Sequence, residues 1–107
     1  IKQIKNNMKK TINFYDFKDA FRKQGREDQF TNSGLRTIFD YIEDYEDSAD
    51  EEVELDVIAI CCEYSEYKNI ADFWLEYDKE DYPDMDNIEY DTTVIMIDEE
   101  AFIIEQF

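Results

Sequence analysis

TNSGLRTIFDYIEDYED, residues 31–47, is the stretch that decides the fold, because it predicts the clearest helix in the chain. Its apolar residues keep to one stripe that begins with the i, i+3, i+4, i+7 spacing of a helix with one buried face. They are Leu35, Ile38, Phe39, Ile42 and Tyr45. Residues 31–33 offer N-cap side chains, so we expect a helix that begins there and runs to about Asp47.

The segments on either side of this helix predict a second helix and one ambiguous element. Residues 14–24 carry phenylalanines at helical spacing and are followed by Gly25, a plausible helix stop. Residues 47–52 form a charged connector, and VELDVIAICCEY, residues 53–64, follows it. The β-branched residues and continuous apolar centre of 53–64 suit a buried strand. Its apolar spacing fits a helix as well, so both assignments stay open.

The last third predicts a short helix and a β-hairpin. Asn69 is a cap for a helix through Tyr77, and residues 78–91 have the acidic composition of a loop. TTVIMI (92–97) and AFIIEQF (101–107) are the two strands, joined by a turn near residues 98–100. The order ααβαββ predicts one α+β domain over residues 8–107, with helices packed on a small antiparallel sheet. The strands are apolar on both faces, so either helices cover both or one face is buried in a dimer or partner interface.

Two features of the chain concern its processing and its compartment. Residues 1–7 precede Met8-Lys9-Lys10, which has the form of a natural start, so we expect 1–7 to be an expression remnant or an N-terminal extension. Neither a signal peptide nor an apolar run of membrane-spanning length is evident. Cys61 and Cys62 are adjacent and unsuited to pairing with each other, which predicts buried free thiols. These observations predict a cytoplasmic protein inside a host cell.

Charge is divided unevenly along the chain. Residues 37–107 hold 25 acids and only two bases, whereas residues 1–36 hold nine bases and four acids. The net charges of the two parts are therefore −23 and +5, within a total of −18. Such an imbalance argues about partners rather than fold, and it predicts a basic protein partner. Nucleic acid and anionic lipid would be repelled, so we expect neither to bind directly.

The chain lacks the usual equipment of catalysis and metal binding. It has no histidine, only two cysteines and no glycine-rich phosphate loop. An EF-hand loop that begins at Asp44 would place Ala49 where glycine is needed and Leu55 where glutamate is needed. We therefore expect no enzyme activity, no cofactor and no metal site.

Acids recur at three- and four-residue spacing along the predicted second helix and continue into the connector. Like charges at this spacing repel, and acids near a helix C-terminus oppose the macrodipole, so the pattern costs stability and suggests a function. Seven of the eight tyrosines directly follow an acid, and acid–Tyr pairs suit an arginine-rich surface. The alternative is a solvated face that maintains solubility. The candidate partner-binding residues are Asp40, Glu43, Asp44, Asp47, Asp50, Glu51, Glu52, Tyr41 and Tyr67.

IFDYIEDYEDSADEEVELDVIAICCEYSEY, residues 38–67, resembles a group of small acidic proteins from phages and mobile elements. The resemblance carries no assigned activity and no catalytic residues. It implies an anti-restriction or anti-CRISPR protein, in which an acidic nucleic-acid mimic blocks the basic site of a host restriction or CRISPR enzyme. Two alternatives remain: an immunity protein or antitoxin that neutralises a basic nuclease, and an oligomeric assembly protein, for example a homodimer.

Overall fold

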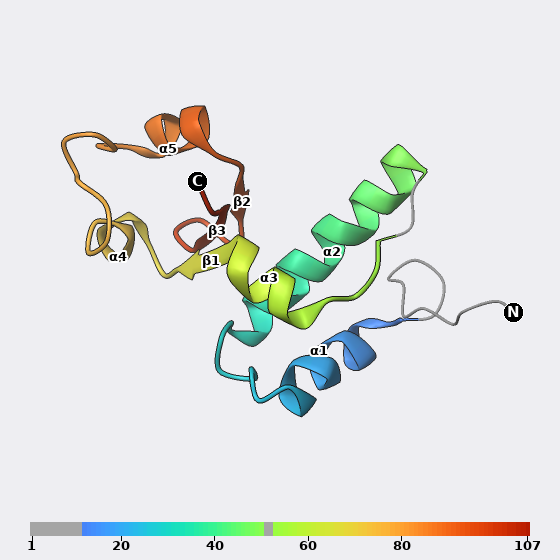
Figure 1. Cartoon of the computed structure of the whole chain (residues 1–107). Coiled ribbons are helices and arrows are strands. Elements are labelled where there is room, and N and C mark those ends of the chain that lie inside the picture. The colour runs from blue at the N-terminus through green and yellow to red at the C-terminus, as the bar shows by residue number, and fades with distance from the viewer. Residues whose placement is uncertain (1–11, 51–52) are drawn as a thin grey trace, which may run out of the picture. The chain divides into compact units, whose positions relative to one another are not determined.

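The structure of the chain is a computed structural model that describes residues 12–50 and 53–107 (Figure 1). Its helices are α1 (Phe14–Lys23), α2 (Asn32–Ala49), α3 (Val57–Glu63), α4 (Ile70–Phe73) and α5 (Met85–Asp91). Its strands are β1 (Tyr64–Tyr67), β2 (Val94–Met96) and β3 (Phe102–Glu105). The predicted α+β class, with helices and a small antiparallel sheet, is confirmed. The expectation about residues 1–7 lies outside the described residues.

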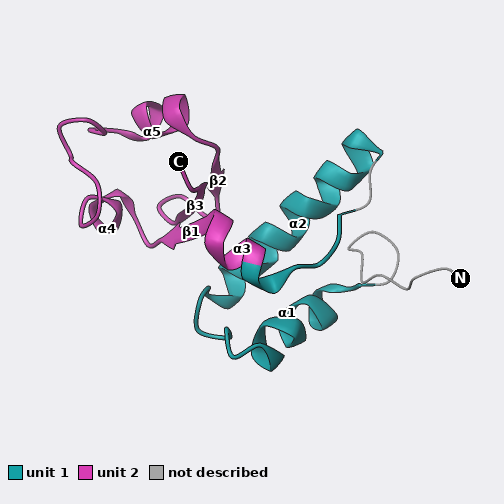
Figure 2. Cartoon of the chain, in the orientation of Figure 1, with its two compact units in different colours: residues 1–58 teal, residues 59–107 magenta. Residues whose placement is uncertain are grey.

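The chain divides into two compact units, residues 1–58 and residues 59–107 (Figure 2). We call them unit 1 and unit 2 and describe each by itself. Unit 1 contains α1 and α2, and unit 2 contains the sheet with α4 and α5, while the boundary falls within α3.

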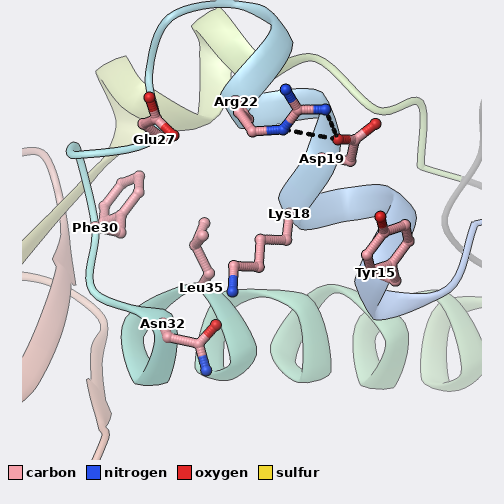
Figure 3. A pocket seen from close by; sticks show the side chains of 8 residues that line it. All are labelled: Tyr15, Lys18, Asp19, Arg22, Glu27, Phe30, Asn32 and Leu35. Carbon is pink, nitrogen blue, oxygen red and sulfur yellow. Dashed lines mark hydrogen bonds and ion pairs between the residues drawn. The ribbon is translucent and has the colours of Figure 1, made fainter.

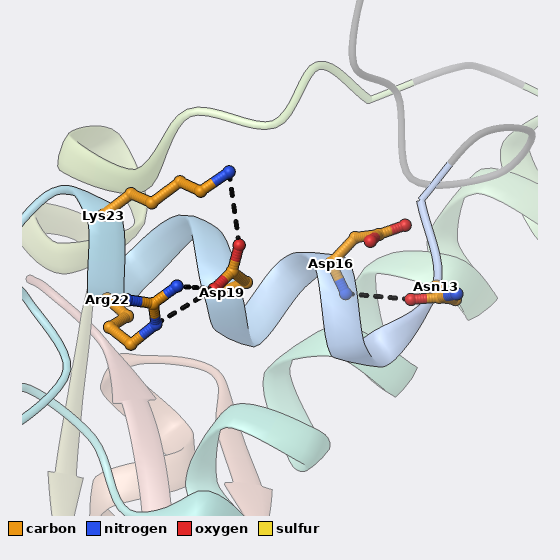
Figure 4. Close-up of polar contacts among 5 residues, drawn as sticks. All are labelled: Asn13, Asp16, Asp19, Arg22 and Lys23. Carbon is orange, nitrogen blue, oxygen red and sulfur yellow. Dashed lines mark hydrogen bonds and ion pairs between the residues drawn. The ribbon is translucent and has the colours of Figure 1, made fainter.

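In unit 1, helix α1 begins where the sequence predicts a helix. Asn13 is its N-cap, and the Asn13 Oδ1 accepts a hydrogen bond of 2.8 Å from the backbone N–H of Asp16 (Figure 4). One turn later, Asp19 pairs with Arg22 and, at 3.3 Å, with Lys23. Gly25 follows the helix with a φ of 73°, a left-handed conformation that glycine adopts without strain.

Helix α2 is capped by Thr31, whose Oγ1 accepts a hydrogen bond of 2.9 Å from the Gly34 N–H. Helix α1 packs against α2 through aromatic side chains. The ring centroids of Phe17 and Phe39 lie 5.3 Å apart, and those of Phe21 and Phe30 lie 6.0 Å apart. All four rings are buried, so the phenylalanines of α1 form the core of unit 1 with the apolar stripe of α2.

The apolar stripe of α2 differs from the prediction at its C-terminal end. Leu35, Ile38, Phe39 and Ile42 are buried as expected, but Tyr45 is 47% exposed. Glu46, four residues after Ile42, occupies the buried position instead and has no exposed surface. The last turn of α2 therefore buries a carboxylate where we expected a ring.

The ambiguous segment 53–64 is a helix over most of its length, so the strand assignment was wrong. Helix α3 covers Val57–Glu63, with Val57 and Ile60 buried one turn apart, and β1 begins only at Tyr64. The two cysteines of α3 form no disulfide with each other, as predicted. Their predicted burial is wrong, because Cys62 is exposed and Cys61 is only half-buried.

The sheet of unit 2 has the strand order β1-β3-β2, with both pairings antiparallel. The predicted hairpin is confirmed: β2 pairs with β3 in the register Val94↔Ile104. The Asp98 Oδ1 accepts hydrogen bonds from the N–H groups of Glu100 (2.8 Å) and Ala101 (2.7 Å), which fixes the predicted turn. Strand β1 adds to the other edge, with Tyr67 opposite Phe102.

The central strand β3 is buried on both faces. Phe102 and Ile104 point to one face, where they form a core cluster with Phe73 of α4 and Ile88 of α5. Ile103 points to the opposite face and is also fully buried. The two apolar faces that the sequence predicts are therefore both covered at this strand.

The predicted cap and start of helix α4 are confirmed, but α4 ends at Phe73 rather than at Tyr77, and helix α5 was not predicted. The Asn69 Oδ1 caps α4 by accepting from the Asp72 N–H at 2.9 Å. Residues 78–91, predicted as a loop, include α5, which begins after its N-cap Asp84. The Asp84 Oδ1 accepts from the Asn87 N–H at 3.1 Å, and Ile88 gives the short helix its buried contact.

Candidate partner-binding site

Four of the predicted partner-binding acids lie together on one face of α2. At about 100° of rotation per residue, Asp40, Glu43, Asp44 and Asp47 fall within a sector of roughly 100°. This sector is opposite the buried stripe that contains Ile38. We call these four residues the acidic strip. The same amphipathic pattern that packs α2 into unit 1 therefore turns the strip towards solvent.

The N-terminal end of the strip is partly neutralised by Arg36. The Arg36 Nε lies 3.3 Å from the Asp40 Oδ1, and both side chains are about half exposed. The guanidinium carbon of Arg36 lies 5.0 Å from the centroid of the Phe14 ring, a cation–π distance. An exposed pair of this kind contributes about 0–1 kcal/mol to stability. Arg36 thus marks the end of the acidic strip without burying it.

The pKa of one carboxyl in the middle of the strip, that of Glu43, is shifted. Burial of the half-buried Glu43 side chain raises the pKa of this carboxyl above its usual value, and the neighbouring charges of Asp40, Glu46 and Asp47 raise it further. Glu43 and Asp44 form no ion pair with any residue that the structure describes. Glu43 and Asp44 therefore carry negative charge that no ion pair among the described residues neutralises.

Glu46 belongs to α2 but not to the acidic strip. Its carboxylate is fully buried, and the Glu46 Oε2 accepts a hydrogen bond of 2.7 Å from the backbone N–H of Val53. The Glu46 Oε1 has no hydrogen-bond partner among the described residues. The position was visible in the sequence, because Glu46 follows Ile42 by four residues and so continues the buried stripe.

The remaining predicted acids belong to the connector after α2, and the structure describes one of them, Asp50. Asp50 is the C-cap residue, exposed and in the left-handed conformation at a φ of 54°, and its N–H donates to the Glu46 carbonyl. It extends the line of exposed acids by one position beyond the helix. Glu51 and Glu52 lie outside the described residues.

The two predicted tyrosines are placed differently. Tyr41 is half-buried on α2, on the flank of the helix next to the acidic strip. Tyr67 is in unit 2, where only 5% of it is exposed and its ring lies 5.3 Å from that of Phe73. Its hydroxyl donates to the Glu76 Oε1 at 2.5 Å. Tyr67 is a core residue, so the structure does not bring it together with the acidic strip.

Neither a metal centre nor a membrane-spanning helix is found in the described part of the chain. Within residues 12–50 and 53–107, His, Cys, Asp and Glu side chains form no group of three that could hold a metal ion. Among those same residues, every helix is too short or too polar to cross a bilayer.

Comparisons with known proteins give no relative from which a function can be transferred. A scan of protein-family models, a search of the curated proteins and a search of the solved structures each found no match to this chain.

Proposed function

We propose that this chain is an anti-defence inhibitor that acts as an acidic nucleic-acid mimic. In this proposal it blocks the basic DNA- or RNA-binding site of a host restriction or CRISPR enzyme. The observation that carries the proposal is the acidic strip: the exposed Asp40, Asp44 and Asp47 and the half-buried Glu43 share one face of α2, and the exposed Asp50 follows the helix. The strip is held on a capped helix whose opposite face is buried, so its charges are fixed in position before a partner arrives.

The charge of the strip supports a basic partner. Burial raises the pKa of the Glu43 carboxyl first, and the negative charges of Asp40, Glu46 and Asp47 raise it further. A cationic surface that binds there relieves this repulsion, and the gain adds to the attraction between the two proteins. Residues 37–107 carry a net charge of −23 and residues 1–36 a net charge of +5. A basic partner would therefore be attracted by residues 37–107 rather than by residues 1–36.

The spacing of the strip is compatible with a phosphate track. One helical turn rises about 5.4 Å, and a DNA strand presents a phosphate about every 3.4 Å along the axis. Acids at three- and four-residue intervals, supplemented by the connector, approximate such a row of charges. Tyr41, half-buried on the flank of the strip, adds ring surface that suits arginine.

The first test is capture from a host lysate at low salt, followed by elution at high salt. The bait is the full chain, compared with the four-acid variant D40N/E43Q/D44N/D47N. The matched control is E80Q/D81N/E89Q/E99Q, which removes the same number of exposed acids from unit 2. Counterion release predicts that a phosphate-binding surface is eluted by salt.

We expect wild type and the unit 2 control to retain the same basic nucleic-acid enzyme and the four-acid variant to lose it. Circular dichroism should show that the four-acid variant keeps its helices, because removal of like charges from α2 relieves repulsion. Retention of the enzyme by the folded four-acid variant would contradict the proposal.

A further inference from the structure

A cavity of about 190 Å³ lies in unit 1, between α1 and the N-terminal part of α2 (Figure 3). The buried Phe30 and Leu35 and the exposed Tyr15 supply its apolar lining, and the exposed Lys18 and Glu27 leave it open to solvent. An enclosed apolar cavity of about 150 Å³ holds benzene, so this volume has room for a single ring with one small substituent. The cavity opens on the side of α2 that carries Leu35, whereas the acidic strip lies on the opposite side of this helix.

Lys18 supplies an exposed positive charge at this cavity. Figure 3 shows its side chain extending from α1 towards α2, with the ammonium group beside Leu35. Within the part of the chain that the structure describes, the Lys18 ammonium makes neither a hydrogen bond nor an ion pair. A cation next to a buried apolar surface is a place where an anionic group with an apolar body gains from both contacts.

Two other charged residues of the lining, Arg22 and Asp19, are paired with each other. Arg22 donates from both Nε and Nη2 to the Asp19 Oδ1, as the dashed lines in Figure 3 mark. The Arg22 guanidinium lowers the pKa of the Asp19 carboxyl, which agrees with a formed pair. This pair contributes little net charge to the cavity, so Lys18 is the cation that a ligand would meet.

Glu27 limits which anions can enter. In Figure 3 it lies at the rim, on the side of the cavity away from Lys18, with Phe30 and Leu35 between them. A ligand with a negative charge at both ends would place one of them against Glu27. Like charges disfavour that arrangement, so the lining favours one anionic end and an uncharged body.

We propose that this cavity binds a small aromatic monocarboxylate, with the carboxylate at Lys18 and the ring against Phe30 and Leu35. The site is independent of the proposed function, because none of its residues belongs to the acidic strip. Failure of one proposal therefore leaves the other intact.

The test is an NMR titration of the full chain with four aromatic probes. Benzoate is compared with benzyl alcohol and benzylamine, which are close to it in size, and with the larger dianion terephthalate. Benzoate should bind roughly three- to fivefold more tightly than benzyl alcohol, the range expected for one solvent-facing ion pair. Benzylamine and terephthalate should bind more weakly than benzoate, and the shifted amides should be those of α1 and residues 30–35.

Two variants assign the discrimination to named residues. Lys18→Gln should remove the preference for benzoate over benzyl alcohol, and Glu27→Gln should improve the binding of terephthalate. Lys68→Gln, which removes one exposed lysine from unit 2, should change neither. Equal binding of benzoate and benzyl alcohol to wild type, or a preference that survives in Lys18→Gln, would overturn the assignment.

Discussion

The buried carboxylate of Glu46 accepts a 2.7 Å hydrogen bond from the backbone N–H of Val53, seven residues later in the chain. This contact ties the segment that follows α2 back to the last turn of the helix. It also separates the acids of α2 by role: Glu46 faces the core and holds the connector, while the acidic strip faces outwards. Asp40, Asp44 and Asp47 of the strip are exposed, so their carboxylates can reach a partner without disturbing the core.

Replacement of Glu46 tests this separation. Glu46→Ala leaves the N–H of the half-buried Val53 without its acceptor and should lower the free energy of unfolding by about 1–3 kcal/mol. Glu46→Gln keeps an acceptor oxygen and removes a buried charge, so its loss should be less than half as large. Urea unfolding followed by circular dichroism measures both. The solvent-facing Asp44→Ala on the same helix is the control, and an equal effect of Glu46→Ala and Asp44→Ala would refute the structural role of Glu46.

Glu43→Gln should stabilise the fold at neutral pH. Because the pKa of the Glu43 carboxyl is raised in the folded state, the folded state binds protons more readily than the unfolded state just above pH 4.5. The free energy of unfolding therefore falls as pH rises through that window, and an uncharged residue avoids the loss. We expect a gain of a few tenths of a kcal/mol at pH 8 that vanishes at pH 3. Urea titrations of wild type and variant at both pH values decide this, and a gain that persists at pH 3 would exclude an electrostatic origin.

The hydroxyl of Tyr82 in unit 2 should ionise at a higher pH than that of an ordinary tyrosine. Its hydroxyl donates a 2.7 Å hydrogen bond to the Asp91 carboxylate, and this contact, with some burial, raises the pKa of Tyr82 to about 12. The neutral hydroxyl is the form that the fold favours, so any stability it gives is present below pH 10 and lost as pH rises through 12. In Asp91→Asn, the Tyr82 midpoint in a ¹³C NMR titration should move towards 10. An unchanged midpoint would mean that Asp91 does not control this hydroxyl.

The last residue of the chain stacks on the aromatic cluster of unit 2. The Phe107 ring lies 5.4 Å from the Tyr77 ring at an interplanar angle of 6°, and Tyr77 stacks in turn on Phe73. Aromatic pairs contribute about 0.5–1.5 kcal/mol beyond the area they bury, so Phe107→Ala should cost about 1 kcal/mol. Fluorescence of Trp74, the single tryptophan, reports the unfolding of this unit. The highly exposed Leu75→Ala is the control, and equal stability of the two variants would rule out the stack as a stabilising contact.

Local signals in the sequence predict α1, α2, α4 and the hairpin, because caps and periodic apolar residues decide these elements. Thr31 and Asn69 act as the caps that their positions indicate. Strand β1 depends instead on a partner far along the chain, since Tyr64 pairs with Glu105. No feature of residues 53–64 predicts that pairing. The segment alone therefore could not show that it forms helix α3 and that the strand begins only at its last residue.

The candidate site could be predicted where helical periodicity determines exposure. Asp40 and Asp44 are exposed because their spacing from the buried Ile38 and Ile42 places them on the other side of α2. Tyr67 shows the limit of this reasoning. It follows an acid like its surface counterparts, yet its pairing opposite Phe102 in the sheet buries it.

Competition with nucleic acid is the most direct test of the proposed mimicry. The enzyme captured by the chain is bound to a fluorescently labelled duplex or guide RNA, and the anisotropy of the label is followed as the chain is added. We expect wild type and the unit 2 control to displace the nucleic acid competitively. The variant D40N/E43Q/D44N/D47N should need at least a roughly tenfold higher concentration for the same displacement. A ternary complex that keeps its nucleic acid, or displacement by the four-acid variant at wild-type concentrations, would contradict it.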